Sequence, residues 1–311
     1  MSADPLAGQY IQRALAAAPA AGNAALDECW RRIIVPAAIK ERLLNHVLLA
    51  LEIRGRGIPR TALPLHGLIV LSGPPGVGKS TLARGVAGPA ARHLDGRYGP
   101  LRIVEMNPHL LPSELLGRTQ RNVISVFKDE LPALAGDNPA VLVLDDMEVL
   151  GIARSRASLS VNPVDVHRGT AALLTVLDWL SWEMPRVVVV GTTNLPGALD
   201  DAVLSRADVT LDVQPPGRAA VEAILADTLR ALGGAYPGCG ELAEDPRIAE
   251  VAALLDGCDG RQARKFIGEA LALRTETALH PDSLTAAVLL TAARTWRAAG
   301  RPGSPADAVD G

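Results

Sequence analysis

The strongest signal for fold class is residues 68–80, Leu68-Ile69-Val70-Leu71-Ser72-Gly73-Pro74-Pro75-Gly76-Val77-Gly78-Lys79-Ser80. The apolar run Leu68–Leu71 predicts a buried strand, and Thr81–Ala87 has a helical pattern. The segment between them matches the phosphate-binding pattern GxxxxGK followed by Ser or Thr, in the strand–loop–helix context that the pattern requires. Its glycines let backbone N–H groups close around phosphate oxygens at a helix N-terminus. We therefore expect nucleotide contacts from Gly73, Pro74, Pro75, Gly76, Val77, Gly78, Lys79, Ser80 and Thr81.

A pair of acids follows the apolar run Val141–Leu144. Asp145 and Asp146 stand at the tip of this predicted strand, where P-loop proteins hold Mg²⁺. The Ser80 hydroxyl would also be a Mg²⁺ ligand, and Lys79 would reach the β- and γ-phosphates. Asp146 would polarise the attacking water. The predicted cofactors are therefore ATP and Mg²⁺.

Three later polar residues complete the predicted site. Asn194 follows the apolar run Val187–Val190 and is expected between the attacking water and the γ-phosphate. Arg206 stands in a polar loop, from which it would reach a neighbouring subunit's γ-phosphate as an arginine finger. A surface salt bridge with Asp208 is the alternative for Arg206. Arg261 opens a helix and would contact the phosphates of its own subunit, unless it is an ordinary helix-start residue.

Strand and helix patterns alternate over most of the chain. Leu101–Glu105 and Leu211–Val213 are further predicted strands. Such alternation predicts an α/β fold with a parallel sheet covered by helices on both faces. Helical spacing runs from Asp27 to Ile53, and beyond residue 217 only helical patterns occur, at 218–232, 246–256, 261–279 and 284–298. We expect an N-terminal arm (1–26, a short helix or loose), a large α/β domain (27–216), a small all-helical lid (217–299) and a disordered tail (300–311).

Composition limits the classes of partner. The formal net charge is −3, so no overall positive field invites nucleic acid. The cysteines Cys29, Cys239 and Cys258 lack CxxC spacing, which argues against a disulfide framework or a zinc knuckle. No apolar run approaches the roughly 18 residues of a membrane span, and the N-terminus lacks the positive region of a signal peptide. We expect a cytoplasmic protein that binds neither membrane nor nucleic acid.

The order of these motifs resembles that of AAA+ ATPases. Within this class the chain is similar to the pachytene checkpoint protein two family, the remodellers of HORMA-domain proteins, over about residues 28–295. The similarity rests on Trp30, Ile34-Val35, the helix from Lys40 to Leu51, Arg97-Tyr98-Gly99, Val104-Glu105-Met106-Asn107, Asp145 to Leu150 with Arg154, Pro163, Asp165 and Arg168, Arg206-Ala207-Asp208, Pro215-Pro216, Gly257, Gly260-Arg261 and Arg264-Lys265.

The resemblance implies a homohexamer that pulls on a flexible segment of a HORMA-domain protein and converts its closed form to an open one. Bacterial relatives accompany anti-phage (CBASS) systems in which a HORMA protein activates a cyclic-oligonucleotide synthase, and the remodeller disassembles the active complex. The expected pore loop carries Leu115-Leu116 where the family has an aromatic residue, with core packing as the alternative. The family's second acid is usually Glu, so Asp146 leads to the hypothesis of slow hydrolysis.

Two other functions remain open from sequence. A nucleotide-gated switch or assembly factor would bind ATP tightly and hydrolyse little. Asp146 is the residue that supports this alternative. A DNA-linked loader is disfavoured by the net charge of −3 and by the absence of an appended basic or helix-turn-helix domain.

Overall fold

The computed structural model describes residues 14–59, 61–111, 118–151, 163–195, 197 and 199–299. These residues form two compact units. The first unit holds the chain up to Pro74 and from Lys79 to Val213, and the second holds Pro75–Gly78 and the chain from Gln214 onward. The boundary between the units at Val213 and Gln214 lies close to residue 216, where the sequence changes from mixed strand and helix patterns to helical patterns alone.

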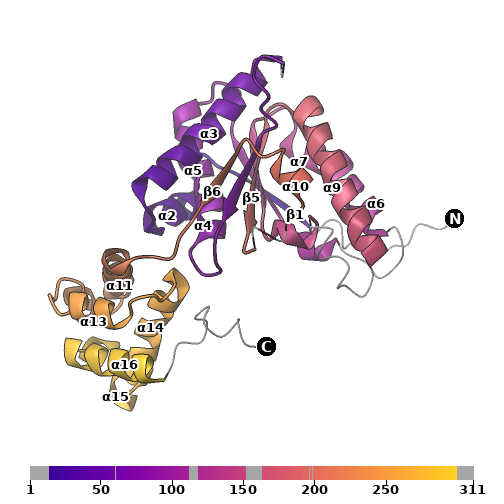
Figure 1. Cartoon of the computed structure of the whole chain (residues 1–311). Helices are drawn as coiled ribbons and strands as arrows, with labels where there is room; N and C mark the ends of the chain where they lie inside the picture. The colour runs from indigo at the N-terminus through magenta and orange to yellow at the C-terminus, as the bar shows by residue number, and fades with distance from the viewer. Residues whose placement is uncertain are drawn as a thin grey trace, which may run out of the picture. The chain divides into compact units, whose positions relative to one another are not determined.

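A six-stranded sheet forms the centre of the first unit (Figure 1). The four pairings among β3, β4, β5, β2 and β6 are all parallel, which confirms the predicted α/β fold. Strands β2, β4 and β5 are buried along their whole length, as their continuous apolar sequences predicted. In spatial order the strands are β1 (Leu15–Pro19), β3 (Arg102–Met106), β4 (Ala140–Leu144), β5 (Val187–Thr193), β2 (Leu68–Ser72) and β6 (Val209–Asp212).

The register of the parallel strands brings three predicted motifs to one edge of the sheet. Ser72, the last residue of β2, pairs with Thr193 of β5. Leu144, the last residue of β4, pairs with Gly191 of the same strand. The chain therefore leaves β2, β4 and β5 at neighbouring points. The carboxyl ends of parallel strands are the usual place for a ligand in such sheets.

Strand β1 is an addition that the sequence did not predict. It runs antiparallel to β3 at the edge of the sheet, so the expectation of a short helix or loose arm is wrong for Leu15–Pro19. Three of its five residues are alanines, which have little β propensity. The strand therefore depends on the free edge of β3, which no local sequence signal reveals. Hydrogen bonds from the Asn107 amide to the Ala14 carbonyl, and from the Ala20 amide to the Leu101 carbonyl, continue the pairing.

Helices cover the sheet, with α2–α5 on one side and α6, α7 and α9 on the other (Figure 1). Alternate strand residues supply the two faces, and Leu142 and Val189 join a core with Val176 of α9 and with Phe127, which lies in the helical turn between α6 and α7. The helices and short turns of the first unit are α2 (Ala24–Arg32), α3 (Ala37–Gly55), α4 (Lys79–Gly85), α5 (Ala87–Leu94), η1 (Pro108–Leu110), α6 (Arg118–Ser125), η2 (Val126–Glu130), α7 (Leu131–Ala135), η3 (Met147–Val149), α9 (Pro163–Glu183) and α10 (Asp201–Leu204).

The helical spacing predicted from Asp27 to Ile53 belongs to two helices. Pro36 is the N-cap residue of α3, and α2 already ends at Arg32 with Ile33 in an extended conformation. Proline disfavours a helical conformation in the residue before it, here Val35, so one helix does not run through Pro36 although the apolar periodicity continues.

The second unit contains only helices among its described residues, as predicted. They are α11 (Arg218–Gly233), α12 (Pro237–Leu242), α13 (Ile248–Leu254), α14 (Gly260–Ala272), α15 (Thr275–Leu279), η5 (Pro281–Ser283) and α16 (Ala286–Ala298). The single helix predicted for 261–279 breaks at Arg274, which is extended. The Thr277 hydroxyl lies 2.6 and 3.1 Å from the carbonyl oxygens of Leu271 and Arg274 and can donate its one proton there, which competes with the helical backbone pattern. Helix α12 was missed because its Pro and two Gly residues are weak helix formers.

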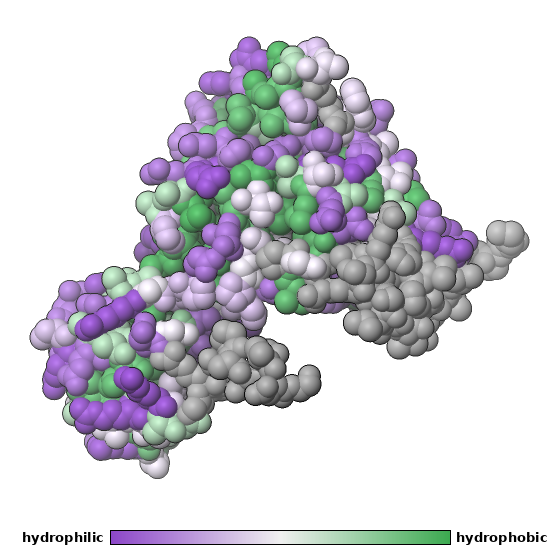
Figure 2. Space-filling view, in the orientation of Figure 1, coloured by the Kyte–Doolittle hydropathy of each residue, from purple (hydrophilic) through white to green (hydrophobic). Residues whose placement is uncertain are grey.

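Polar and apolar side chains are interspersed on the visible surface (Figure 2). None of the helices in the described part of the chain combines the length and apolar character that crossing a bilayer requires.

Gly67 lies just before β2 at φ +79°, where a side chain has no room. A Cβ atom there would lie 1.8 Å from Nη1 of Arg54. The Arg54 side chain is buried and donates to the carbonyls of Val187 at 2.6 Å and Leu180 at 3.1 Å. This arginine therefore links α3 to β5 and to the end of α9 by hydrogen bonds. Its guanidinium occupies the space that a side chain at residue 67 would fill.

We expect Gly67→Ala to lower the free energy of unfolding by roughly 2–4 kcal/mol, from left-handed strain and overpacking against Arg54. Gly57→Ala is the matched control, because Gly57 has φ +69° but nothing within 4 Å of an added Cβ. The control should lose only about 1 kcal/mol from backbone strain. Denaturant unfolding of both variants measures the difference. Equal losses of unfolding free energy in the two variants would show that crowding against Arg54 does not contribute to the effect of Gly67→Ala.

Candidate active site

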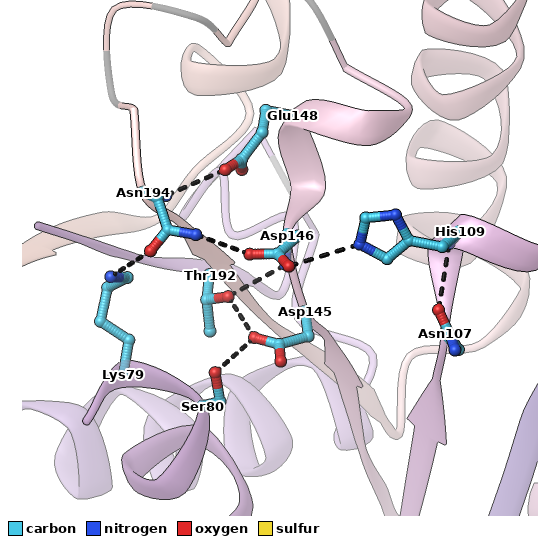
Figure 3. Close-up of polar contacts among 9 residues, drawn as sticks. All are labelled: Lys79, Ser80, Asn107, His109, Asp145, Asp146, Glu148, Thr192 and Asn194. Carbon is cyan, nitrogen blue, oxygen red and sulfur yellow. Dashed lines mark hydrogen bonds and ion pairs between the residues drawn. The ribbon is translucent and has the colours of Figure 1, made fainter. Parts of the chain in front are cut away.

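Lys79, the first residue of α4, is held by three oxygen atoms at the edge where β2 and β5 end (Figure 3). Its Nζ donates to the carbonyls of Gly73 at 2.8 Å and Pro74 at 2.7 Å, and to Oδ1 of Asn194 at 2.8 Å. The side chain is only 5% exposed. Gly73 has φ +143°, and a Cβ there would lie 2.2 Å from the Val213 carbonyl oxygen, so this turn requires glycine. Phosphate oxygens bind an ammonium more strongly than neutral carbonyls do, so Lys79 is placed to accept an anionic ligand.

We expect Lys79→Met to weaken ATP binding by roughly 10²-fold, because charge-assisted hydrogen bonds to the phosphates would be lost. Methionine keeps an unbranched apolar stem of similar length, so the fold should survive. Titration with a fluorescent ATP analogue measures the affinity, and thermal unfolding checks the fold. Lys265→Met is the control, since Lys265 is exposed on α14. Unchanged affinity for the ATP analogue in a folded Lys79→Met protein would show that Lys79 does not bind the phosphates.

A hydroxyl and a carboxylate meet beside Lys79. Ser80 Oγ donates to Oδ1 of Asp145 at 2.7 Å, and the Thr192 hydroxyl donates to the same oxygen at 2.5 Å. Mg²⁺ prefers hard oxygen ligands and is usually held by one or two protein groups together with water and substrate phosphates. The part of the chain that the structure describes contains no group of three or more His, Cys, Asp or Glu side chains able to enclose a metal. Ser80 and Asp145 fit the shared type of Mg²⁺ site that the sequence predicted.

The second acid, Asp146, has the left-handed backbone conformation, with φ 50° and ψ 56°. Its amide donates to Oγ1 of Thr192 at 3.1 Å. Its Oδ1 accepts from Nδ2 of Asn194 at 2.8 Å, and its Oδ2 lies 3.4 Å from a ring nitrogen of His109. The Asn194 side chain therefore joins Lys79 through its oxygen and Asp146 through its nitrogen (Figure 3). The structure brings these predicted residues together at one point.

Glu148 supports Asn194 from the other side. Its Oε1 accepts a hydrogen bond from the Asn194 amide at 3.1 Å. Its Oε2 is buried and has no hydrogen-bond partner in the described structure. Glu148 therefore fixes the backbone of Asn194, while the Asn194 side chain contacts Lys79 and Asp146.

Arg206 is bound in its own chain by an acid on α9. Its Nε and Nη2 donate to the two carboxylate oxygens of Asp178 at 2.7 and 2.8 Å, and its Nη1 donates to the Ala202 carbonyl at 2.8 Å. This forked pair with Asp178 raises the pKa of Arg206. Asp208, the partner considered from sequence, instead accepts from the amides of His66 and Gly67 at 2.6 and 2.8 Å. Burial raises the pKa of Asp208, and these two hydrogen bonds oppose the shift.

Arg261 belongs to the second unit. It lies between Asp259 and Gln262, the two residues that form a capping box at the start of α14. Its amide donates to the carbonyl of Gly76 at 3.2 Å, and both residues lie in this unit. Its predicted role at the phosphates stays a prediction.

Some of the predicted site residues lie outside the described structure. Conversely, some residues of the observed site were not predicted from the sequence. The pore-loop residues Leu115 and Leu116 fall outside the described residues. No sequence motif predicted a role for Thr192, Glu148, His109 or Asp178. Thr192 could have been found from its place at a strand end two residues before Asn194. Asp178 sits inside a long helix, where an acid is usually solvated, so it gave no signal.

The sheet order and the position of each motif define a P-loop domain of the AAA class. The family model for the ATPase family associated with various cellular activities (AAA) matches residues 69–215. The chain is 39% identical over 269 residues to CD-NTase-associated protein 6 of Pseudomonas aeruginosa, which covers 86% of this chain and 88% of that protein. It therefore belongs to the AAA ATPase family, in the group that contains this protein.

More distant relatives carry the name that the motifs indicated. The chain is 32% identical over 191 residues to the pachytene checkpoint protein 2 homolog of Arabidopsis thaliana, over 61% of this chain. It spans 41% of that longer relative. Among solved structures, Caenorhabditis elegans PCH-2 has a TM-score of 0.72 at 20% identity, over 90% of this chain and 75% of that one. The Escherichia coli MS115-1 HORMA:CdnC:Trip13 complex has a TM-score of 0.71 at 19% identity, over 90% of this chain and 93% of that one. At these identities the two structures support the fold alone.

Proposed function

We propose that this chain is an ATPase that remodels a HORMA-domain protein. It acts in the cytoplasm as a homohexamer, converts the closed HORMA form to the open form, and so disassembles a HORMA-activated signalling complex in anti-phage defence. The observation that carries this proposal is the 39% identity with CD-NTase-associated protein 6 across most of both chains. A solved complex that shares the fold contains a HORMA protein together with Trip13, which supports the same kind of partner.

The geometry of the first unit supports nucleotide chemistry. Lys79 would exchange its contacts with the Gly73 and Pro74 carbonyls for phosphate oxygens. Bound Mg²⁺ would neutralise phosphate charge beside Ser80 and Asp145. Asp146 would accept the proton of the attacking water, and its carboxylate is already oriented by a hydrogen bond from Asn194. Arg206 of a neighbouring subunit would stabilise the charge that develops on the transferred phosphoryl group.

A nucleotide-gated switch is the second candidate. The specific observation in its favour is Asp146, whose carboxylate is one methylene shorter than the usual glutamate. A displacement of about 1 Å in a reacting group can cost roughly 10²-fold in rate. Such a protein would hold its partner in the ATP state and release it only after slow turnover.

The test uses a purified HORMA-domain protein from the same genome, closed around a fluorescent peptide. Wild-type chain and ATP should release the peptide and lower its fluorescence anisotropy. The reaction should stop in the Asp146→Asn variant and with a non-hydrolysable ATP analogue. Lys265→Met, changed at an exposed position, should behave as wild type.

Three results separate the candidates. Release that needs hydrolysis supports the remodeller. Stable capture of the HORMA protein in the presence of the non-hydrolysable analogue, without release of the peptide, supports the switch. ATP hydrolysis without any release from the HORMA protein would leave the ATPase assignment and exclude this substrate.

A further inference from the structure

The hydroxyl of Thr192 contacts both acids of the site at once. It donates to Oδ1 of Asp145 at 2.5 Å and accepts from the amide of Asp146 at 3.1 Å. A threonine hydroxyl has one proton, so a hydrogen bond donated to Asp145 leaves only its lone pairs for the Asp146 amide. The direction of both bonds is therefore fixed.

Thr192 is held rigidly by the sheet. Its residue is 1% exposed, and it lies in β5, where it pairs with Leu71 of β2. The preceding residue, Gly191, pairs with Leu144 at the end of β4. The hydroxyl thus projects from the central strand at the level where Asp145 leaves β4, and its position does not depend on a loop.

The backbone of Asp146 needs such support. Its left-handed conformation is uncommon for a residue with a side chain, although Asp tolerates it better than most. Thr192 accepts the amide proton on one side of this residue, and Asn194 donates to its carboxylate on the other. Without the hydroxyl, the partly buried amide would lose its acceptor, and the backbone could relax to a different φ and ψ. The carboxylate would then point elsewhere.

We propose that Thr192 is a positioning residue that fixes both acids together, Asp145 for Mg²⁺ and Asp146 for the attacking water. This inference rests on the proposed ATPase function. It predicts that one hydroxyl controls two properties that separate residues would otherwise control: the Mg²⁺ dependence of nucleotide binding and the rate of turnover.

Thr192→Val tests the proposal, since valine keeps the branched shape and removes the hydroxyl. We expect kcat to fall roughly tenfold, the effect of losing one well-placed hydrogen bond. KM for ATP should change little, because the contacts of Lys79 are untouched. The apparent affinity for Mg²⁺, measured by titrating Mg²⁺ into protein with a fluorescent ATP analogue, should also fall. Binding of the analogue in EDTA should match wild type.

Two further variants separate position from packing. Thr193→Val removes a second buried hydroxyl from the same strand, which accepts the Leu195 amide at 3.2 Å and contacts neither acid. Adjacent strand residues face opposite sides of the sheet, so this control should keep wild-type Mg²⁺ dependence and kcat. Thr192→Ser retains the hydroxyl and should restore most of both properties.

Equal effects of Thr192→Val and Thr193→Val would overturn the proposal, as would wild-type Mg²⁺ dependence in Thr192→Val. A Thr192→Ser variant as defective as Thr192→Val would also overturn it, because the hydroxyl would then not be enough to position the acids. Failure of the proposed function looks different. A wild-type chain that binds the analogue with Mg²⁺ but does not turn over is not an ATPase, and the Mg²⁺ titration still decides the role of Thr192.

Discussion

Asp146→Asn is expected to keep ATP bound while turnover falls by roughly 10³-fold, within the range for loss of a general base. The amide cannot accept the proton of the attacking water or supply negative charge to polarise it. Asparagine tolerates the left-handed conformation at φ 50° as aspartate does, so the loop should stay folded. Lys79 and Ser80 are unchanged, which preserves the phosphate contacts. Phosphate release measures turnover, and a fluorescent ATP analogue measures binding.

Asp146→Glu is the companion variant for this site. A faster Glu variant would show that the missing methylene limits hydrolysis. A variant no faster than wild type would mean that the left-handed backbone already places the shorter carboxylate, and it would remove the hypothesis of slow hydrolysis. Near wild-type turnover in Asp146→Asn would show that another group accepts the proton.

Arg206→Ala is expected to lower turnover by roughly 10³-fold, the lower end of what an arginine finger contributes. The guanidinium is presented by its forked pair with Asp178, at 2.7 and 2.8 Å, and its side chain is 24% exposed. It therefore remains partly exposed, as the proposed contact with a neighbouring subunit requires. ATP binding by the same subunit should persist, because none of the contacts of Lys79 involves Arg206.

A mixing experiment distinguishes action between subunits from a local salt bridge. Arg206→Ala and Asp146→Asn subunits should each be inactive alone. Mixed rings should recover part of the turnover, because an intact Asp146 then faces an intact Arg206 of the neighbour. Asp178→Ala should lower turnover less than Arg206→Ala, since it removes only the orientation of the guanidinium. No recovery on mixing, with equal loss of thermal stability in the Arg206 and Asp178 variants, would reduce Arg206 to a structural partner of Asp178.

The sequence by itself determined the parallel sheet and the place of each motif along it. This was possible because the determinants are local. A buried strand reads as a short apolar run, a P-loop reads as closely spaced glycines before Lys79, and strand ends are marked by Asp145 and Asn194. Once the strands are parallel, their carboxyl ends share one edge of the sheet, so these residues are expected at that edge, while strand order and register bring them into contact.

Tertiary structure alone decided what holds these residues in position. Strand β1 is Ala-rich and forms because the edge of β3 is free. Thr192 bridges Asp145 and Asp146 because β4 and β5 pair in one register. Asp178 reaches Arg206 from 28 residues away along the chain. Each of these contacts joins segments that are distant in sequence. Their strength depends on register and packing, which no short stretch of sequence encodes, because a hydroxyl or carboxylate gains a partner only after the chain has folded.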